Sequence, residues 1–324
     1  MGHSCGVGTI TDANYISNFV GERLISKGLR ASPVSLRRHS HDMADLPDTK
    51  LVYLSKGRQG LVVMISPPQF PEVVAEECRK TLQMRSQLGD LGAPILEPLD
   101  SGHMESCSYA VMPYRKPLSS RRGMQWVHRI WVKRHLLEWL LQVAQRRSGT
   151  CEESQYRASL DALGERVAPD SPTAALLQMG QSRLRSGRFA PRTTPMHGDL
   201  WKGNVLHGVG STAFTLVDWR GSEIQGFPLF DLIRTAGSFG LSPKALSREL
   251  QLHRAALGCQ IEDLPLYLLG ALGHYAAHLG EMSPALFRSM ADECAQRLSS
   301  ALDASATFAP LRLLANGHGR HAPT

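Results

Sequence analysis

The chain has 324 residues, of which 42% are hydrophobic and 20% charged, and its formal net charge is +7 at pH 7. This composition is that of an ordinary globular protein and excludes a chain too polar to pack a core. No apolar run approaches the roughly 20 residues of a membrane span, and the first dozen residues lack the pattern of a signal peptide. We therefore expect a cytoplasmic protein, and the length favours two lobes over a single core.

Residues 1–114 predict a small lobe that mixes helices with strands. Residues 1–12 are expected to be disordered, and a helix is expected over residues 12–27. The stretch "TKLVYLSKGRQGLVVMIS" predicts a hairpin, because glycines and polar residues separate two apolar runs. "FPEVVAEECRKTLQMRSQL" predicts a second helix, and "APILEPLDSG" and "SYAVMPYRKPL" predict two further strands.

Residues 115–315 predict a mainly helical second lobe, because apolar residues recur there with the helical period of 3.6. The first such stripe consists of Trp126, Ile130, Leu137, Leu141 and Ala144. One segment, "NVLHGVGSTAFTLVDW", predicts two short strands joined by a glycine-rich turn before the helices resume. The end of the chain, residues 316–324, is expected to be disordered.

The polar motif "HGDLWKGN", residues 197–204, lies between the helical segments and this strand pair. It supplies Asp199 and Asn204, and the second strand ends at Asp218. One carboxylate aimed at a substrate, with two oxygen ligands for a hard cation, is the set that phosphoryl transfer requires. A zinc site made from His197, Asp199 and His207 is a weaker interpretation, because it needs another protein ligand and leaves the asparagine without a role.

These residues resemble the catalytic and metal-binding motifs of the aminoglycoside phosphotransferase and choline kinase group of the protein-kinase-like superfamily. "GFPLFDLIR" is similar to the stretch that follows the metal-binding aspartate in that group. The resemblance implies that Asp199 is the catalytic base, that His197 organises the catalytic loop, and that Asn204 and Asp218 hold Mg²⁺. It also implies that Asp231 braces the loop.

The resemblance further implies the fold class α+β, as a bilobal protein-kinase-like fold with a small antiparallel β-rich N-lobe and a mainly helical C-lobe. ATP and Mg²⁺ are the implied cofactors. In this family a hinge joins the lobes, and "VMPYRKPL" corresponds to it. Backbone groups of Met112, Pro113 and Tyr114 would then meet the adenine.

The N-lobe departs from the family pattern at one position. The family usually has a lysine in the strand after the first hairpin, paired with a glutamate of the next helix, to hold the α- and β-phosphates. Here Met64 stands at the expected place, while Glu76 or Glu77 can supply the acid. Lys56 or Arg58 of the turn is a candidate substitute. The alternative is a pseudokinase that binds a nucleotide or a partner without turnover.

Positive charge is concentrated after the hinge, where the family builds the acceptor side of its cleft. Residues 115–147 contain a single acid, Glu138, and the cations Arg115, Lys116, Arg121, Arg122, Arg129, Lys133, Arg134, Arg146 and Arg147. This charge would repel a polycationic aminoglycoside, so we expect a neutral or anionic acceptor such as a sugar or a sugar-linked metabolite. A glycated amine stays open, because "HGDLW-GN" also resembles fructosamine kinases. Nucleic acid is not expected, because the arginines are not interleaved with a stacking aromatic platform.

Overall fold

The computed structural model of the chain describes residues 12–29, 34–39, 50–55, 60–118, 122–187, 189–278 and 282–306. They form two compact units. The first comprises the described residues up to Val132 together with Gly203–Ser222, and the second comprises Lys133–Lys202 and the described residues from Glu223 onward. Disorder was predicted for residues 1–12 and 316–324; all of these except Asp12, which caps α1, lie outside the described residues. The lobe boundaries predicted at 114 and 315 stay predictions.

The first unit contains a five-stranded antiparallel sheet in the order β1-β2-β3-β5-β4. Its strands are β1 (Leu36–Arg38), β2 (Leu51–Ser55), β3 (Leu61–Ile65), β4 (Asp100–Met104) and β5 (Cys107–Pro113). The hairpin predicted from residues 49–66 is confirmed as β2 and β3. The strand predicted over residues 93–102 was placed too early, because β4 begins at Asp100. The short strand β1 was not predicted.

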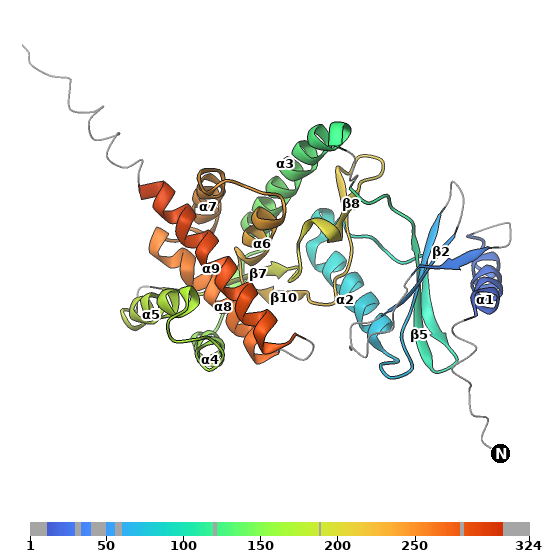
Figure 1. Cartoon of the computed structure of the whole chain (residues 1–324), viewed down its shortest axis with the longest axis horizontal. Coiled ribbons are helices and arrows are strands. Elements are labelled where there is room, and N and C mark those ends of the chain that lie inside the picture. Colours follow the sequence, from blue (N-terminus) through green and yellow to red (C-terminus); the bar gives the residue numbers. More distant parts are fainter. Residues whose placement is uncertain are drawn as a thin grey trace, which may run out of the picture. The chain divides into compact units, whose positions relative to one another are not determined.

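Two helices cover opposite faces of this sheet (Figure 1). The helix α1 (Ala13–Ser26) packs against one face, and α2 (Val73–Leu88) packs against the other. Side chains alternate between the two faces along each strand. Val63 therefore lies in the cluster under α1, whereas Met64 lies with Val74 in the cluster under α2.

A small hairpin from later in the chain also belongs to the first unit. Its strands are β8 (Val205–His207) and β9 (Phe214–Leu216), as predicted from the sequence. The hairpin is attached to the segment before β4, because the Leu216 amide donates to the Pro94 carbonyl at 2.8 Å and the Leu96 amide donates to the Leu216 carbonyl at 3.1 Å. These bonds fix the strand end at which Asp218 lies.

The second unit contains helices and a three-stranded sheet in the order β10-β7-β6. Its strands are β6 (Gly149–Thr150), β7 (Arg192–Met196) and β10 (Glu223–Gly226). Its helices are α4 (Glu153–Gly164), α5 (Pro172–Arg185), α6 (Phe230–Ser238), α7 (Pro243–Leu257), α8 (Leu264–Ala277) and α9 (Pro284–Ala306). The division between the units falls within α3 (Arg122–Arg146). Among the residues that the structure describes, no helix is both long enough and apolar enough to cross a membrane.

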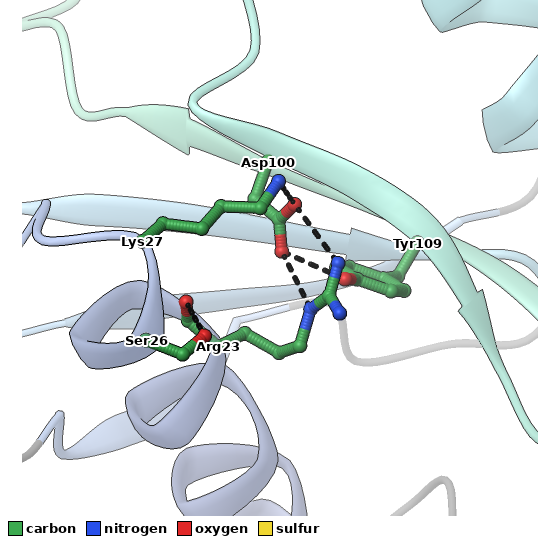
Figure 2. A network of polar contacts seen from close by, with 5 residues as sticks. All are labelled: Arg23, Ser26, Lys27, Asp100 and Tyr109. Atoms are coloured by element: carbon green, nitrogen blue, oxygen red, sulfur yellow. Dashed lines mark hydrogen bonds and ion pairs between the residues drawn. The ribbon is translucent and has the colours of Figure 1, made fainter.

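A buried carboxylate anchors α1 to the sheet of the first unit (Figure 2). Asp100 accepts an ion pair from Lys27, a second from Arg23 at 3.3 Å, and a hydrogen bond from the Tyr109 hydroxyl at 2.7 Å. Burial alone would raise the pKa of Asp100, but these three donors outweigh it, and the pKa is lowered from its ordinary value. Burial, reinforced by the carboxylate, raises the pKa of Tyr109 to about 12. The network therefore holds a charged carboxylate at neutral pH.

Candidate active site

The predicted site residues are divided between the two units. His197, Asp199 and Asp231 belong to the second unit, and Glu77, Asn204, Asp218 and the hinge residues belong to the first. Lys56 and Arg58, the candidate substitutes for the missing lysine, lie outside the described residues.

In the second unit, a buried aspartate fixes the loop that carries Asp199. This loop leaves β7 at His197, and Asp231 approaches it from the first turn of α6. The Asp231 carboxylate accepts the His197 amide at 2.6 Å and the Gly198 amide at 3.0 Å. Gly198 has a φ of +88°, a conformation that suits glycine and brings its amide toward the carboxylate. The bracing role inferred for Asp231 is consistent with these two bonds.

The ionisation of Asp231 reflects its burial. Burial raises its pKa, while the interaction with His197 and the two amide bonds act in the opposite direction. His197 is itself buried, and its Nδ1 accepts the Asp199 amide at 3.3 Å. The imidazole thus supports the backbone of the loop from inside.

Asp199 points outward from this fixed loop. Its side chain is 47% exposed, and its carboxylate lies 3.4 Å from Nη2 of Arg234. Arg234 follows Asp231 by three residues on α6, so the two lie on one side of the helix. The sequence reasoning missed Arg234, although the spacing in "FDLIR" was a usable signal. The loop therefore presents an accessible carboxylate beside the guanidinium group of Arg234.

In the first unit, the backbone segments that carry the two predicted metal ligands lie side by side. Asn204 directly precedes β8, Asp218 follows β9 by two residues, and the Val217 amide donates to the Asn204 carbonyl at 3.2 Å. Asp218 has a φ of +65°, a conformation in which aspartate is tolerated and most residues are strained. An amide oxygen and a carboxylate are donors that Mg²⁺ accepts, so this pair fits a hard cation and is too small and too hard a set for zinc.

A lysine that the sequence reasoning missed lies beside Asp218. Lys50 precedes β2 by one residue, and its Nζ forms an ion pair with Glu77 of α2 and another with Asp218, the latter at 3.0 Å. Glu77 is buried, whereas Glu76 is exposed, so the helix acid is Glu77. Met64 of β3 packs among apolar residues under α2. A lysine–glutamate ion pair is therefore present at Glu77, and its lysine directly precedes β2 instead of lying in β3.

The hinge residues extend β5 to its end. Met112 and Pro113 pair with β3, and the Tyr114 amide donates to the Gly60 carbonyl at 2.8 Å. Proline has no amide hydrogen, so neither Pro113 nor Tyr114 has a backbone donor left for adenine. Their contact with the nucleotide stays a prediction and would have to use carbonyl groups or side chains.

Two other polar residues, His207 and Arg183, have partners within the protein. The ring of His207 stacks on that of His128 with centroids 4.0 Å apart, and burial lowers the pKa of His207. Arg183 of α5 forms an ion pair with Asp263 at 2.9 Å and donates a hydrogen bond to Gln260. These partners account for both side chains without a ligand.

Comparison with known proteins places this geometry in context. Residues 47–264 match the model of a family described as "Phosphotransferase enzyme family". No curated protein matches the chain.

Several solved structures resemble the chain. One is a thermostable mutant of the aminoglycoside phosphotransferase APH(4)-Ia in a ternary complex with ADP and hygromycin B, at 13% identity and a TM-score of 0.51, covering 87% of this chain and 98% of that one. Another variant of that protein, in complex with AMP-PNP and hygromycin B, gives 15% identity and a TM-score of 0.50, with 86% and 98% covered. The choline kinase LicA from Streptococcus pneumoniae gives 12% identity and a TM-score of 0.47, with 91% and 100% covered. The two APH(4)-Ia structures show the fold, and the predicted protein-kinase-like fold class is confirmed.

Proposed function

Because the chain belongs to the phosphotransferase enzyme family, we propose that it is an ATP- and Mg²⁺-dependent kinase that phosphorylates a hydroxyl group of a small molecule. The observation that carries this proposal is the exposed carboxylate of Asp199 on a loop fixed from below by Asp231. A general base must be both accessible and held in place. The loop meets both requirements within a family whose members transfer phosphate.

The candidate site residues of the two units then each have a role in the transfer. The Asp199 carboxylate accepts the proton of the acceptor hydroxyl, whose oxygen forms a bond to the γ-phosphorus as the bond to the β–γ bridging oxygen breaks and ADP leaves. Asn204 and Asp218 would hold Mg²⁺, which neutralises charge on the phosphate oxygens. His197 and Asp231 keep the loop in position.

We further propose that the acceptor is neutral or anionic. A pocket of about 190 Å³ in the second unit is lined by Trp201, Arg234 and Arg297 among others. Trp201 follows Asp199 by two residues and is 42% exposed, which offers an aromatic surface. Gly237 leaves room for Arg297 against α6, because an added Cβ would lie 2.9 Å from its Nε.

The charges of this pocket support that choice. Arg297 forms an ion pair with Glu293 at 2.9 Å, which leaves no acid of the pocket unpaired to attract a cationic acceptor. Arg234, which forms an ion pair with Asp199, is a second cation that lines this pocket. A sugar or sugar phosphate suits an aromatic surface next to arginines, whereas a polycationic acceptor would be repelled.

The direct test is ADP release from Mg-ATP over a panel of neutral, anionic and cationic hydroxyl compounds. We expect turnover with one or more neutral or anionic compounds and its loss in Asp199→Asn. Efficient phosphorylation of aminoglycosides would overturn the proposed acceptor class while leaving the kinase assignment in place.

A second candidate is a protein that binds a nucleotide without turnover, and Met64 in place of the usual lysine is the observation that favours it. Thermal shift with Mg-ATP distinguishes the two when it is combined with the ADP-release panel. Stabilisation of the wild type and Asp199→Asn alike, with no ADP release from either, would support the binding protein.

A further inference from the structure

We propose that Lys50 holds the α- and β-phosphates of the nucleotide, in place of the lysine that β3 lacks. This inference rests on the proposed function, because it assigns a residue to the same nucleotide site. It concerns a position one residue before β2 that no sequence pattern identified.

The register of the sheet places Lys50 on the required face. Val52 lies opposite Met64 in the β2–β3 pairing, and residues two apart on one strand share a face. Lys50 lies two residues before Val52, directly ahead of β2, and its ion pair with Glu77 of α2 places its ammonium group on the face of Val52 and Met64, which α2 covers. A long lysine side chain starting there reaches the same region as one starting from Met64.

The partners of Lys50 are those that a phosphate-binding lysine needs. Glu77 is buried, with a side chain 6% exposed, and its ion pair orients the ammonium group from the side of α2. Asp218, at 3.0 Å, is one of the two proposed Mg²⁺ ligands. A lysine bonded to both is thus tied to the helix and to the predicted metal position at once.

The ratio of carboxylates to ammonium groups distinguishes this cluster from an ion pair that only stabilises the fold. One ammonium group is shared by two carboxylates, and the Asp218 side chain is 37% exposed. An exposed carboxylate can exchange an ammonium partner for a divalent ion, which frees ammonium hydrogens for phosphate oxygens. A purely structural role for Lys50 would require only its ion pair with buried Glu77, and not the pair with exposed Asp218.

The experiment measures the affinities of Mg-ADP and adenosine by isothermal titration calorimetry, in wild type, Lys50→Met, and the double variant Lys50→Met with Met64→Lys. We expect Lys50→Met to weaken Mg-ADP by about 10- to 100-fold, as for the loss of a charge-assisted hydrogen bond. Adenosine, which lacks phosphates, should bind equally well to all three. The double variant should recover most of the loss, because it returns a lysine to the same face.

Arg79→Met is the matched control, since it removes an exposed cation from α2 without touching Lys50, Glu77 or Asp218. Should Lys50→Met fail to fold by circular dichroism, Lys50→Gln carries the same test, because glutamine keeps hydrogen-bonding capacity but loses the charge.

Unchanged Mg-ADP affinity in a folded Lys50 variant would overturn this inference alone and leave the kinase proposal standing. Equal losses of Mg-ADP and adenosine affinity would likewise overturn it, because they would indicate a general structural role. A wild-type protein that binds neither Mg-ADP nor Mg-ATP would overturn both proposals.

Discussion

Two aspartate clusters of the first unit use the same chemical groups in opposite proportions. Around Asp100, two cations and a phenol converge on one carboxylate that is only 3% exposed. Around Lys50, two carboxylates share one cation, and the Asp218 side chain is 37% exposed. The carboxylate of the first cluster is enclosed by its donors, whereas the second cluster presents a partly exposed carboxylate to solvent.

The second unit repeats this contrast. Asp231 is buried and accepts two backbone amides, while the Asp199 side chain is 47% exposed and lies beside Arg234. The comparison suggests a division of labour in which closed aspartates maintain the fold and open ones carry chemistry. Each substitution below tests on which side of that division a residue falls.

The largest effect is expected from Asp199→Asn, because asparagine keeps the shape of the side chain but cannot accept the proton. We expect kcat to fall by about 10²- to 10⁴-fold, the range for a lost general base. Mg-ADP affinity should be unchanged. The measurement is ADP release with a confirmed acceptor, and Asp161→Asn, an exposed aspartate of α4, is the control. Equal rates for Asp199→Asn and wild type would show that Asp199 does not act as the general base.

Asp231→Ala should reduce stability most among the four aspartates. It leaves the buried amides of His197 and Gly198 without their acceptor, at about 1–3 kcal/mol for each. Chemical denaturation should show this loss, with Asp231→Asn intermediate because its amide oxygen can accept one of the two bonds. Activity should fall as well, since the loop carrying Asp199 loses its support. A variant as stable as wild type would contradict the bracing role.

Asp100→Asn should lower stability by about 1–3 kcal/mol, because hydrogen bonds to a charged group are lost. Since folding lowers the pKa of Asp100, its contribution is present above the unfolded pKa of about 3.9 and is lost as the pH falls through the folded pKa. The difference between wild type and variant should therefore shrink in thermal melts below about pH 4. A large loss of kcat in folded Asp100→Asn would contradict the purely structural role proposed for Asp100.

Arg234→Gln should have the smallest effect, because its ion pair with Asp199 is partly exposed. We expect kcat/KM for an anionic acceptor to fall by about 2- to 5-fold relative to a neutral one, as for a partly exposed ion pair. Arg288→Gln, an exposed arginine of α9, is the control. An increase for the anionic acceptor would argue against an arginine-lined acceptor pocket.

Local patterns explain which parts of this molecule could be predicted from its sequence. The β2–β3 hairpin, α2 and the β8–β9 hairpin follow from apolar runs and glycine turns, and these predictions are confirmed. Strand β1 has only three residues, too few to show a period. The start of β4 was missed because Ile95 forms only an isolated bridge, to Leu216 of the later hairpin.

Residues of the candidate site that depend on long-range contacts were harder to predict. Asp199, Asn204 and Asp218 stand out as a motif, but the link between Lys50 and Asp218 spans 168 positions of the chain. The family pattern expects the lysine on β3, whereas Lys50 directly precedes β2, whose Val52 lies opposite Met64 of β3. The Asp100 network was likewise not visible, because its cations come from α1.

The most direct test of the contrast between open and closed aspartates is the effect of Mg²⁺ on ADP affinity. Dissociation constants would be measured with Mg²⁺ and with EDTA for wild type, Asp218→Asn and Asp100→Asn. The account predicts that Mg²⁺ tightens ADP binding to wild type and Asp100→Asn, and that this gain disappears in Asp218→Asn. A full Mg²⁺ gain in Asp218→Asn, or its loss in a folded Asp100→Asn, would contradict it.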